Sequence, residues 1–372
     1  MNWRGKLKEN VCSVSELKKY IHLSSSEEKQ LRKVVRVHPM SVSKYYLSLI
    51  DKDDDKDPIR KQVVPSEEEL NLSGFYDTSG EKENTKTVGL QHKYGQTALI
   101  LSTNRCAAYC RFCFRKRFVG LPSDEILNLF DDAVKYIENH KEINNVLISG
   151  GDPLVLPTSI IEQFLEKLSG VKHLDFIRFG SRIPVAFPER ILDDKSLSGV
   201  LKKYSLKGRR VYVVTHFNHP REITAESIKA VAKLIESNVI VNNQAVLLKG
   251  VNDDPDVLAE LLGKLVAIGV NPYYVFQCRP VRRVKHHFQV SLYDGYQIIE
   301  GAKKRMNGFS KRFRYIMSHR TGKIEIVGIL GDEIYFKYHQ AKKKEDIGRF
   351  FKRKLDREAA WLDDLKPDCQ NI

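Results

Sequence analysis

The sequence predicts an α/β fold built as a full or partial (βα) barrel. From residue 97 onward, short runs of aliphatic and β-branched residues alternate with amphipathic stretches of about ten to fifteen residues. This alternation is typical of βα units on a parallel sheet. Six or seven such units fit into about 220 residues, which favours a barrel over a small open sheet. A chain of 372 residues also has room for flanking segments.

Three regions follow from this pattern. Residues 1–90 are expected to form an accessory region of helices and loops, where Ser24 precedes two glutamates as a helix N-cap does. Residues 91–318 form the predicted core, and residues 319–372 form a C-terminal extension. The core strands are predicted at residues 98–102, 145–149, 176–179, 211–215, 239–248, 273–277 and 313–317. The core helices are predicted at residues 123–139, 158–168, 225–237, 255–268 and 293–306.

The C-terminal extension has its own pattern. Residues 323–327 and 333–338 flank a turn-rich segment at 328–332, which predicts a hairpin. Residues 346–364 then have the periodicity of a charged amphipathic helix. The predicted architecture is therefore an N-terminal helical region, a (βα) barrel core, and a hairpin followed by a helix.

The net charge of +15, from 62 basic and 47 acidic residues, is compatible with anionic partners. Aromatic residues do not alternate with basic ones as they do in single-strand binders, so solvated surfaces are favoured over a nucleic-acid site. No apolar run approaches the roughly 18 residues of a membrane span. The start of the chain leads into charged residues and lacks the layout of a secretory signal, so we expect a soluble protein of the cytoplasm.

Three cysteines follow the first core strand with the spacing CxxxCxxC: Cys106, Cys110 and Cys113. In a barrel this βα loop carries active-site groups. Three thiolates on one loop can bind zinc, Cu(I) or an iron–sulfur cluster, and without a fourth cysteine nearby in the sequence a four-iron cluster keeps one iron open. Chance packing and a zinc site completed by a distant histidine are the alternatives. The isolated cysteines are expected to be inert thiols: Cys12, Cys278 and Cys369.

Two further motifs come directly after predicted strands. The run Gly150-Gly151-Asp152-Pro153 is by itself compatible with a plain βα connection. His216 and His219 lie after another strand, and hydrogen bonding is favoured over metal binding because a third ligand is missing. Gln244, on the strand at 239–248, is a weaker candidate for a ligand contact.

The CxxxCxxC motif resembles that of the radical S-adenosylmethionine (SAM) superfamily, and other segments resemble the lysine 2,3-aminomutase family within it. Among these segments are His92-Lys-Tyr94, Ser149-Gly-Gly-Asp-Pro-Leu154 and Thr215-His-Phe-Asn-His-Pro220, and the resemblance covers about residues 45 to 325. It implies a radical SAM core and an isomerase that moves an α-amino group to the β-carbon of an amino acid. The implied cofactors are a 4Fe-4S cluster, SAM and pyridoxal 5′-phosphate (PLP).

The resemblance also implies roles for individual residues. Cys106, Cys110 and Cys113 would hold the cluster, and Gly150, Gly151 and Asp152 would lie beside the SAM amino group. His216 would lie near the adenosyl group, and Gln244 near it or near the second cofactor. Lys323 would hold PLP as an aldimine, with Lys93 near the PLP phosphate. Arg115 would bind the substrate carboxylate, although a surface position is the alternative.

This chain departs from the family at the PLP lysine. His319-Arg320-Thr321-Gly322 replaces a run of glycines before Lys323, and Thr97 stands where the family carries an arginine. A radical SAM enzyme of this family without PLP therefore remains an alternative. A more distant alternative is a zinc-stabilised RNA-binding protein that uses the cysteines structurally. The family's C-terminal zinc cysteines are missing, since only Cys369 remains, so no structural zinc is expected.

The substrate is expected to differ from lysine. Lysine-specific members of the family carry an aspartate after the Gln-Cys pair, and this chain has Arg279 after Gln277-Cys278. Residues 315–318 also contain no carboxylate. An arginine facing a lysine ammonium is repulsive, so we expect a substrate with an acidic or polar side chain, glutamate being the simplest case. The alternative is that Arg279 pairs with a protein carboxylate.

The expected partners are a small-molecule amino acid and an electron donor such as flavodoxin or ferredoxin. The sequence leaves the oligomeric state open, a homo-oligomer included.

Overall fold

The computed structural model describes residues 2–367, which contain one mixed sheet of twelve strands paired in chain order. Seven neighbouring strands, β3 to β9, run parallel. These strands are β3 (Thr97–Thr103), β4 (Asn145–Gly150), β5 (Phe176–Gly180), β6 (Val211–Thr215), β7 (Ile240–Leu247), β8 (Asn271–Gln277) and β9 (Arg314–Ser318). Within residues 2–367 no ladder joins β12 to β1, so the sheet is open, which is compatible with a partial barrel. The predicted α/β class and all seven predicted core strands are confirmed.

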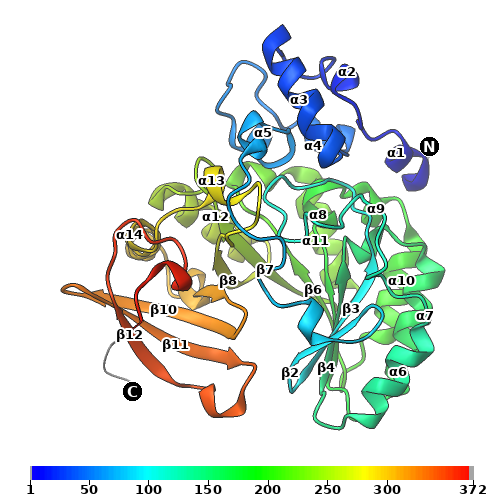
Figure 1. The fold of residues 1–372 in the computed structure, drawn as a ribbon. Coiled ribbons are helices and arrows are strands. Elements are labelled where there is room, and N and C mark those ends of the chain that lie inside the picture. The colour runs from blue at the N-terminus through cyan, green and yellow to red at the C-terminus, as the bar shows by residue number, and fades with distance from the viewer. Residues whose placement is uncertain (1, 368–372) are drawn as a thin grey trace.

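Helices connect the parallel strands, as βα units require. The main ones are α6 (Phe130–Asn139), α7 (Thr158–Ser169), α10 (Lys195–Tyr204), α11 (Ala225–Glu236), α12 (Pro255–Ala267) and α14 (Leu292–Lys304). Shorter helices complete the connections: α8 (Ile183–Ala186), α9 (Glu189–Leu192) and α13 (Lys285–Phe288). Figure 1 shows α6, α7 and α10 along the outside of the parallel strands. The sequence did not predict α10.

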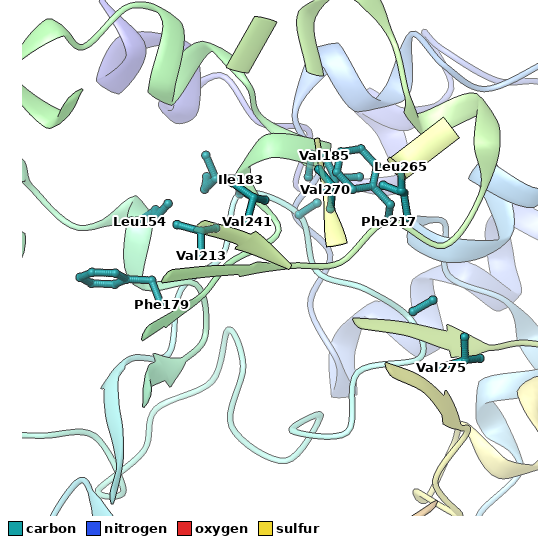
Figure 2. Packing of buried hydrophobic residues seen from close by; sticks show 14 of the residues in the cluster. Leu154, Phe179, Ile183, Val185, Val213, Phe217, Val241, Leu265, Val270 and Val275 are labelled. Carbon is teal, nitrogen blue, oxygen red and sulfur yellow. The ribbon is translucent and has the colours of Figure 1, made fainter. Parts of the chain in front are cut away.

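The core lies between these helices and the sheet. Figure 2 shows Phe179, Val213 and Val241 of the strands gathered with Leu154 and Ile183 of the connections. Burying each such side chain stabilises the fold by about 1.5–3 kcal/mol relative to exposure. Along β7 buried and half-buried residues alternate, because successive side chains point to opposite faces. The fold therefore directs every second side chain of a strand away from the helices.

Antiparallel strands extend the sheet at both edges. β1 (Thr85–Thr87) and β2 (Leu90–Tyr94) precede β3, and β10 (Gly322–Leu330), β11 (Glu333–Ala341) and β12 (Phe350–Lys354) follow β9. Figure 1 shows β10 to β12 on the side of the molecule away from α6 and α7. The predicted boundary at residues 90 and 91 thus lies within β2.

The predicted hairpin is confirmed as β10 and β11, but the helix predicted at 346–364 is wrong. Its first half contains β12, and only the short 3-10 turns η6 (Lys344–Asp346) and η7 (Leu362–Asp364) flank it. The ring of Phe351 stacks on Phe336 of β11 at 5.3 Å. Such cross-strand aromatic pairs stabilise a sheet, and here they outweigh the helical periodicity. The helix predicted at 123–139 begins later, at Phe130, because the backbone of Leu127 is bonded to β3.

Helices and loops make up the N-terminal region up to β1. Its helices are α1 (Trp3–Lys8), α2 (Val14–Leu17), α3 (Ser25–Val37), α4 (Lys44–Leu47), α5 (Pro58–Val63), η1 (Glu67–Leu70) and η2 (Lys82–Asn84). Ser24 caps α3 in a capping box with Glu27, as predicted. The region packs on the short helices that follow β5 and β6. Ser43 donates a 2.5 Å hydrogen bond to the carbonyl of Ala186, and Asp57 pairs with Arg221.

None of the helices in the described residues is both long and apolar enough to cross a membrane. Among the isolated cysteines, Cys12 is exposed and Cys278 is buried. Cys369 lies outside the described residues.

Candidate active site

A cavity of about 340 Å³ brings together every residue predicted for the site. Its volume is within the range of small-ligand pockets. Twelve predicted site residues line it: Lys93, Cys106, Cys110, Cys113, Arg115, Gly150, Gly151, Asp152, His216, Gln244, Arg279 and Lys323. Because these residues span the chain from β2 to β10, only the folded sheet places them together.

The loop after β3 carries the three cysteines. Burial raises the pKa of the Cys106 thiol well above its ordinary value, and it raises that of Cys113 to about 11; the neighbouring thiols add to both shifts. The Cys110 Sγ accepts a 2.8 Å hydrogen bond from Arg182. Binding to iron would replace the thiol protons, since the thiolate is the metal ligand.

The cysteines are not arranged around a single ion. Within residues 2–367 no three His, Cys, Asp or Glu side chains are grouped to ligate one metal ion. In a four-iron cluster each cysteine binds a different iron, so the three sulfurs need not meet at one point. Three thiols on one loop are a donor set that fits such a cluster.

A fourth cysteine, Cys278, also lines the cavity, but it comes from the end of β8. It packs in an apolar cluster with Phe112 and Val281, and burial raises its pKa to about 12. It differs from the other three in position, because it follows β8 and not β3. A cluster held by the three loop cysteines would therefore keep one iron open.

Two glycines bring the end of β4 close to the cysteine loop. Gly150 has φ +108°, and a Cβ there would lie 2.5 Å from the Thr103 carbonyl oxygen. A Cβ at Gly151 would clash with the backbone oxygen of Arg105. The backbone N–H groups of Gly151 and Asp152 donate to the carbonyls of Thr103 and Arg105. The glycines thus serve the packing of the cysteine loop, in addition to any contact with a ligand.

Replacing Gly151 with alanine should lower the free energy of unfolding by about 1–3 kcal/mol, because a backbone carbonyl cannot move aside cheaply. The matched control is Gly199→Ala, since Gly199 lies within α10 and a Cβ there would meet no atom of the described residues within 4 Å. That change should stabilise the protein by about 1 kcal/mol. Urea unfolding of both variants checks the pair, and equal stabilities would contradict the packing role.

The Asp152 carboxylate accepts hydrogen bonds from Ser181 Oγ and from the backbone N–H of Arg182, both at 2.7 Å. Burial raises its pKa to about 6. A carboxylate has further lone pairs that can accept a hydrogen bond from an ammonium group. The contact of Asp152 with the SAM ammonium stays a prediction.

His216 has a ring nitrogen, Nε2, that is buried and lacks a hydrogen-bond partner within the described residues. Burial and the charge of Arg182 lower the pKa of His216 to about 3, so the ring is neutral. Its edge meets Phe112 at 5.5 Å. A buried polar atom without a partner is costly, and at a cavity wall it suits a ligand such as the adenosyl group. Gln244 lines the same cavity from β7, half-buried.

Lys323 lies at the start of the hairpin strand that was predicted at residues 323–327. It is the second residue of β10, paired with Ser318 and Gln340, after a tight turn in which His319 and Gly322 exchange backbone hydrogen bonds. Within residues 2–367 its Nζ has no hydrogen bond or ion pair, and it lies 4.7 Å from the ring centre of Tyr274. Burial, followed by the charges of Arg178, Arg279 and Lys93, lowers the pKa of Lys323 to about 7.

Other cations surround this lysine. Lys93 Nζ donates to the carbonyls of Ser79 and His319 at 3.1 and 2.7 Å, and burial is the main cause that lowers its pKa to about 7. Arg178 donates to Asn145 at 2.6 Å, while its buried Nε has no partner within the described residues. A cavity lined by these groups favours an anion such as a phosphate.

Arg115 is buried and already paired. Its Nε and one terminal nitrogen donate to Glu81 at 3.0 and 2.9 Å, and the other terminal nitrogen donates to Ser149 Oγ at 3.0 Å. The surface alternative is thus wrong for Arg115, which is 4% exposed. The Arg115 guanidinium, which the family resemblance assigns to a substrate carboxylate, binds the Glu81 carboxylate here. The substrate role of Arg115 therefore stays a prediction.

Arg279 remains in the cavity without an acidic partner. One terminal nitrogen donates to Ser318 Oγ at 2.9 Å and the other to Ser79 Oγ, and the guanidinium lies 4.2 Å from the ring centre of Phe114. No carboxylate of residues 2–367 forms an ion pair with it. The serine hydroxyls hold its planar group in place, and the carboxylates of Glu81 and Asp77 act on its charge without forming an ion pair.

Comparison with known proteins identifies the family. The Radical SAM superfamily pattern matches residues 100–262. A putative L-lysine 2,3-aminomutase of Aquifex aeolicus (strain VF5) is 42% identical, over 94% of this chain and 94% of the relative. The L-lysine 2,3-aminomutase of Clostridium subterminale is 40% identical, over 83% of this chain and 73% of the relative.

The chain belongs to the lysine 2,3-aminomutase family of radical SAM enzymes. The glutamate 2,3-aminomutase of Clostridioides difficile (strain 630) is also a relative, at 38% identity over 80% of this chain and 70% of that protein. Membership confirms an enzyme of the isomerase class, and it implies SAM and a 4Fe-4S cluster.

In this radical SAM enzyme the sequence missed several residues that line the cavity or hold its walls. Glu81 and Ser79 lie in a polar segment with few aliphatic residues, yet Glu81 is buried between Arg115 and Arg117. Burial alone would raise the pKa of Glu81, but these two arginines hold it at about 2. Arg182 ends the segment Phe179-Gly-Ser-Arg182, which also resembles the family, and this resemblance was the sequence signal for it.

Proposed function

We propose that this chain is a PLP-dependent amino-acid 2,3-aminomutase of the radical SAM superfamily, acting on an amino acid with an acidic or polar side chain. The observation that carries the proposal is one cavity that holds both the three cysteines and an unpaired lysine amine of lowered pKa. Glutamate is the simplest substrate of this kind. The relatives that act on lysine and on glutamate support the type of reaction.

The cysteine side of the cavity would bind the cluster and SAM. Cys106, Cys110 and Cys113 would each ligate one iron, and the open iron would be left for SAM. His216 Nε2 would gain a partner from the adenosyl group, while Asp152 would face the ammonium. When bound, the cofactors supply the one-electron chemistry that removes a hydrogen atom and the conjugated ring that spreads the unpaired electron. The buried walls around them exclude water.

The cationic side would bind PLP. Near neutral pH a large share of the Lys323 amine is uncharged, which is the form that attacks an aldehyde. The rings of Tyr94 and Tyr274 flank it, at 6.0 and 4.7 Å from Nζ. Lys93 and Arg178 provide positive charge for a phosphate, the latter through a nitrogen without a partner in the described residues. Arg178 thus offers a cation near the position where Thr97 replaces the family's arginine.

The substrate would be selected by charge. Arg279 offers a fixed guanidinium with no acidic partner in residues 2–367, which suits a carboxylate or another polar acceptor at the far end of the substrate. Arg115 would meet the α-carboxylate, provided that the substrate shares or displaces its contact with Glu81.

We expect glutamate to be isomerised and lysine to be a poor substrate. Arg279→Gln should lower kcat/KM for glutamate by about 10–100-fold, the range for loss of a hydrogen bond to a charged group. Arg279→Asp should lower it further and improve lysine. The control is Arg282→Gln, because Arg282 does not line the cavity. Brisk lysine turnover by the unmodified enzyme would refute the charge argument.

The reaction needs a one-electron donor such as flavodoxin or ferredoxin. We also assign the enzyme to the cytoplasm, because a reducing compartment keeps the three thiols free for iron. The oligomeric state stays open, and sedimentation of the purified enzyme would distinguish a monomer from a homo-oligomer.

A further inference from the structure

A buried arginine donates a hydrogen bond to one of the cysteines proposed as cluster ligands. Arg182 follows β5, is 8% exposed, and one terminal nitrogen lies 2.8 Å from the Sγ of Cys110. The guanidinium also lies 5.5 Å from the ring centre of Phe112, on the cysteine loop. The hydrogen bond to Cys110 and the contact with the Phe112 ring together hold the guanidinium against the loop.

The other two nitrogens of Arg182 are also engaged. Its Nε donates to the carbonyl of His216 at 3.2 Å. The second terminal nitrogen lies at 2.8 Å from Tyr46 Oη and at 2.6 Å from both Gln62 Oε1 and Glu222 Oε1. With these partners occupied, the nitrogen that faces Cys110 has little freedom to turn away.

Glu222 is the counter-charge of this arginine. Its side chain is fully buried, and its second oxygen accepts from the backbone N–H groups of Asn218 and His219 at 2.5 and 2.9 Å. The carboxylate therefore has its own supports and would remain in place if the arginine were shortened. The Glu222 carboxylate, 2.6 Å from the guanidinium, balances the positive charge beside Cys110.

Hydrogen bonds to the sulfurs of an iron–sulfur cluster and the local net charge are two of the factors that set its reduction potential. A donor near sulfur stabilises the electron-rich, reduced form. Burial strengthens this effect because the local dielectric is low.

We propose that Arg182 is a positioning residue that raises the reduction potential of the cluster through its hydrogen bond to Cys110, and that Glu222 limits this rise. The inference rests on the proposed function, because it requires that Cys106, Cys110 and Cys113 hold the cluster. Arg182 would thus make the cluster easier to reduce.

The test is a redox titration of the reconstituted full-length enzyme, without substrate, followed by electron paramagnetic resonance of the reduced cluster. The main variant is the double change Arg182→Gln with Glu222→Gln, which removes the pair without altering net charge. It should shift the potential to more negative values by a tenfold change in the ratio of reduced to oxidised cluster, which is about 59 mV for one electron. Glu222→Gln alone should shift it to more positive values.

Two further variants keep the test decisive. If the double variant does not fold, Arg182→Lys takes its place and should give a smaller negative shift, because the planar donor facing Cys110 is lost. The matched control is Arg190→Lys, since Arg190 is also buried and paired with Asp194 but does not line the cavity. Its potential should equal that of the unmodified enzyme.

An intact cluster with an unchanged potential in the Arg182 variants would overturn this inference and leave the proposed function standing. An unmodified protein that binds no iron after reconstitution would overturn the cluster and this inference together. Equal shifts in the Arg182 and Arg190 variants would show a general effect of buried charge, and would also overturn it.

Discussion

Replacing Cys106, Cys110 and Cys113 together with alanine should abolish iron binding. After anaerobic reconstitution the unmodified protein should hold about four iron and four sulfide per chain, and the triple variant should hold almost none. Product formation should fall below detection, because the cofactors carry the reaction and the protein groups alone cannot replace them. Iron and sulfide analysis with the visible absorption spectrum provides the measurement.

The matched control for the cysteines is Cys12→Ala, which removes an exposed thiol far in sequence from the motif. It should retain the full cluster. Circular dichroism should show that the triple variant keeps its fold, because the loop is also held by the buried pair of Arg111 with Glu69 at 2.6 Å. A triple variant that still binds a complete cluster would show that the ligands lie elsewhere.

Replacing Lys323 with alanine should abolish covalent attachment of PLP and reduce product formation by several orders of magnitude. In the unmodified enzyme, borohydride reduction in the presence of PLP should label one peptide, the one that contains Lys323. The control is Lys61→Ala, since Lys61 also has a pKa lowered by burial but does not line the cavity. Peptide mapping by mass spectrometry locates the label.

The pH dependence of this attachment follows from the lowered pKa of Lys323. With a pKa of about 7 the amine is mostly protonated at pH 6 and mostly neutral at pH 8. The attachment rate, followed by PLP absorbance, should therefore rise through pH 7 and level off above it. A rate that keeps rising past pH 10 would indicate an ordinary exposed lysine. Absence of any label would favour a radical SAM enzyme of this family that works without PLP.

The sequence predicts the parallel part of the fold well, because each core strand is a short aliphatic run between amphipathic stretches. It fails in the C-terminal extension, where Phe350 and Phe351 have a helical charge pattern around them but pair with the aromatic residues of β11. Local periodicity contains no information about a partner strand. The same limit explains why β1 and β2, short and polar at the sheet edge, were missed.

The same limit applies to the candidate site, where local motifs were predicted and long-range contacts were not. The cysteine motif is local, since its residues lie within one loop, and it was found from spacing alone. The contacts of Arg115 with Glu81 and of Arg182 with Cys110 join residues 34 and 72 positions apart. Such contacts depend on how the N-terminal region and β5 meet the cysteine loop, which no spacing rule contains. The strand that carries Lys323 was predicted, but its pairing with β9 beside the cavity was not.

The most direct test of the proposed function is a product assay of the reconstituted enzyme with SAM, PLP, a one-electron reductant and a panel of amino acids that includes glutamate and lysine. Mass spectrometry and nuclear magnetic resonance would identify the products under anaerobic conditions. We expect a β-amino isomer of an acidic or polar amino acid, with the same mass as its substrate. Cleavage of SAM without any β-amino isomer from the panel would contradict the proposed function.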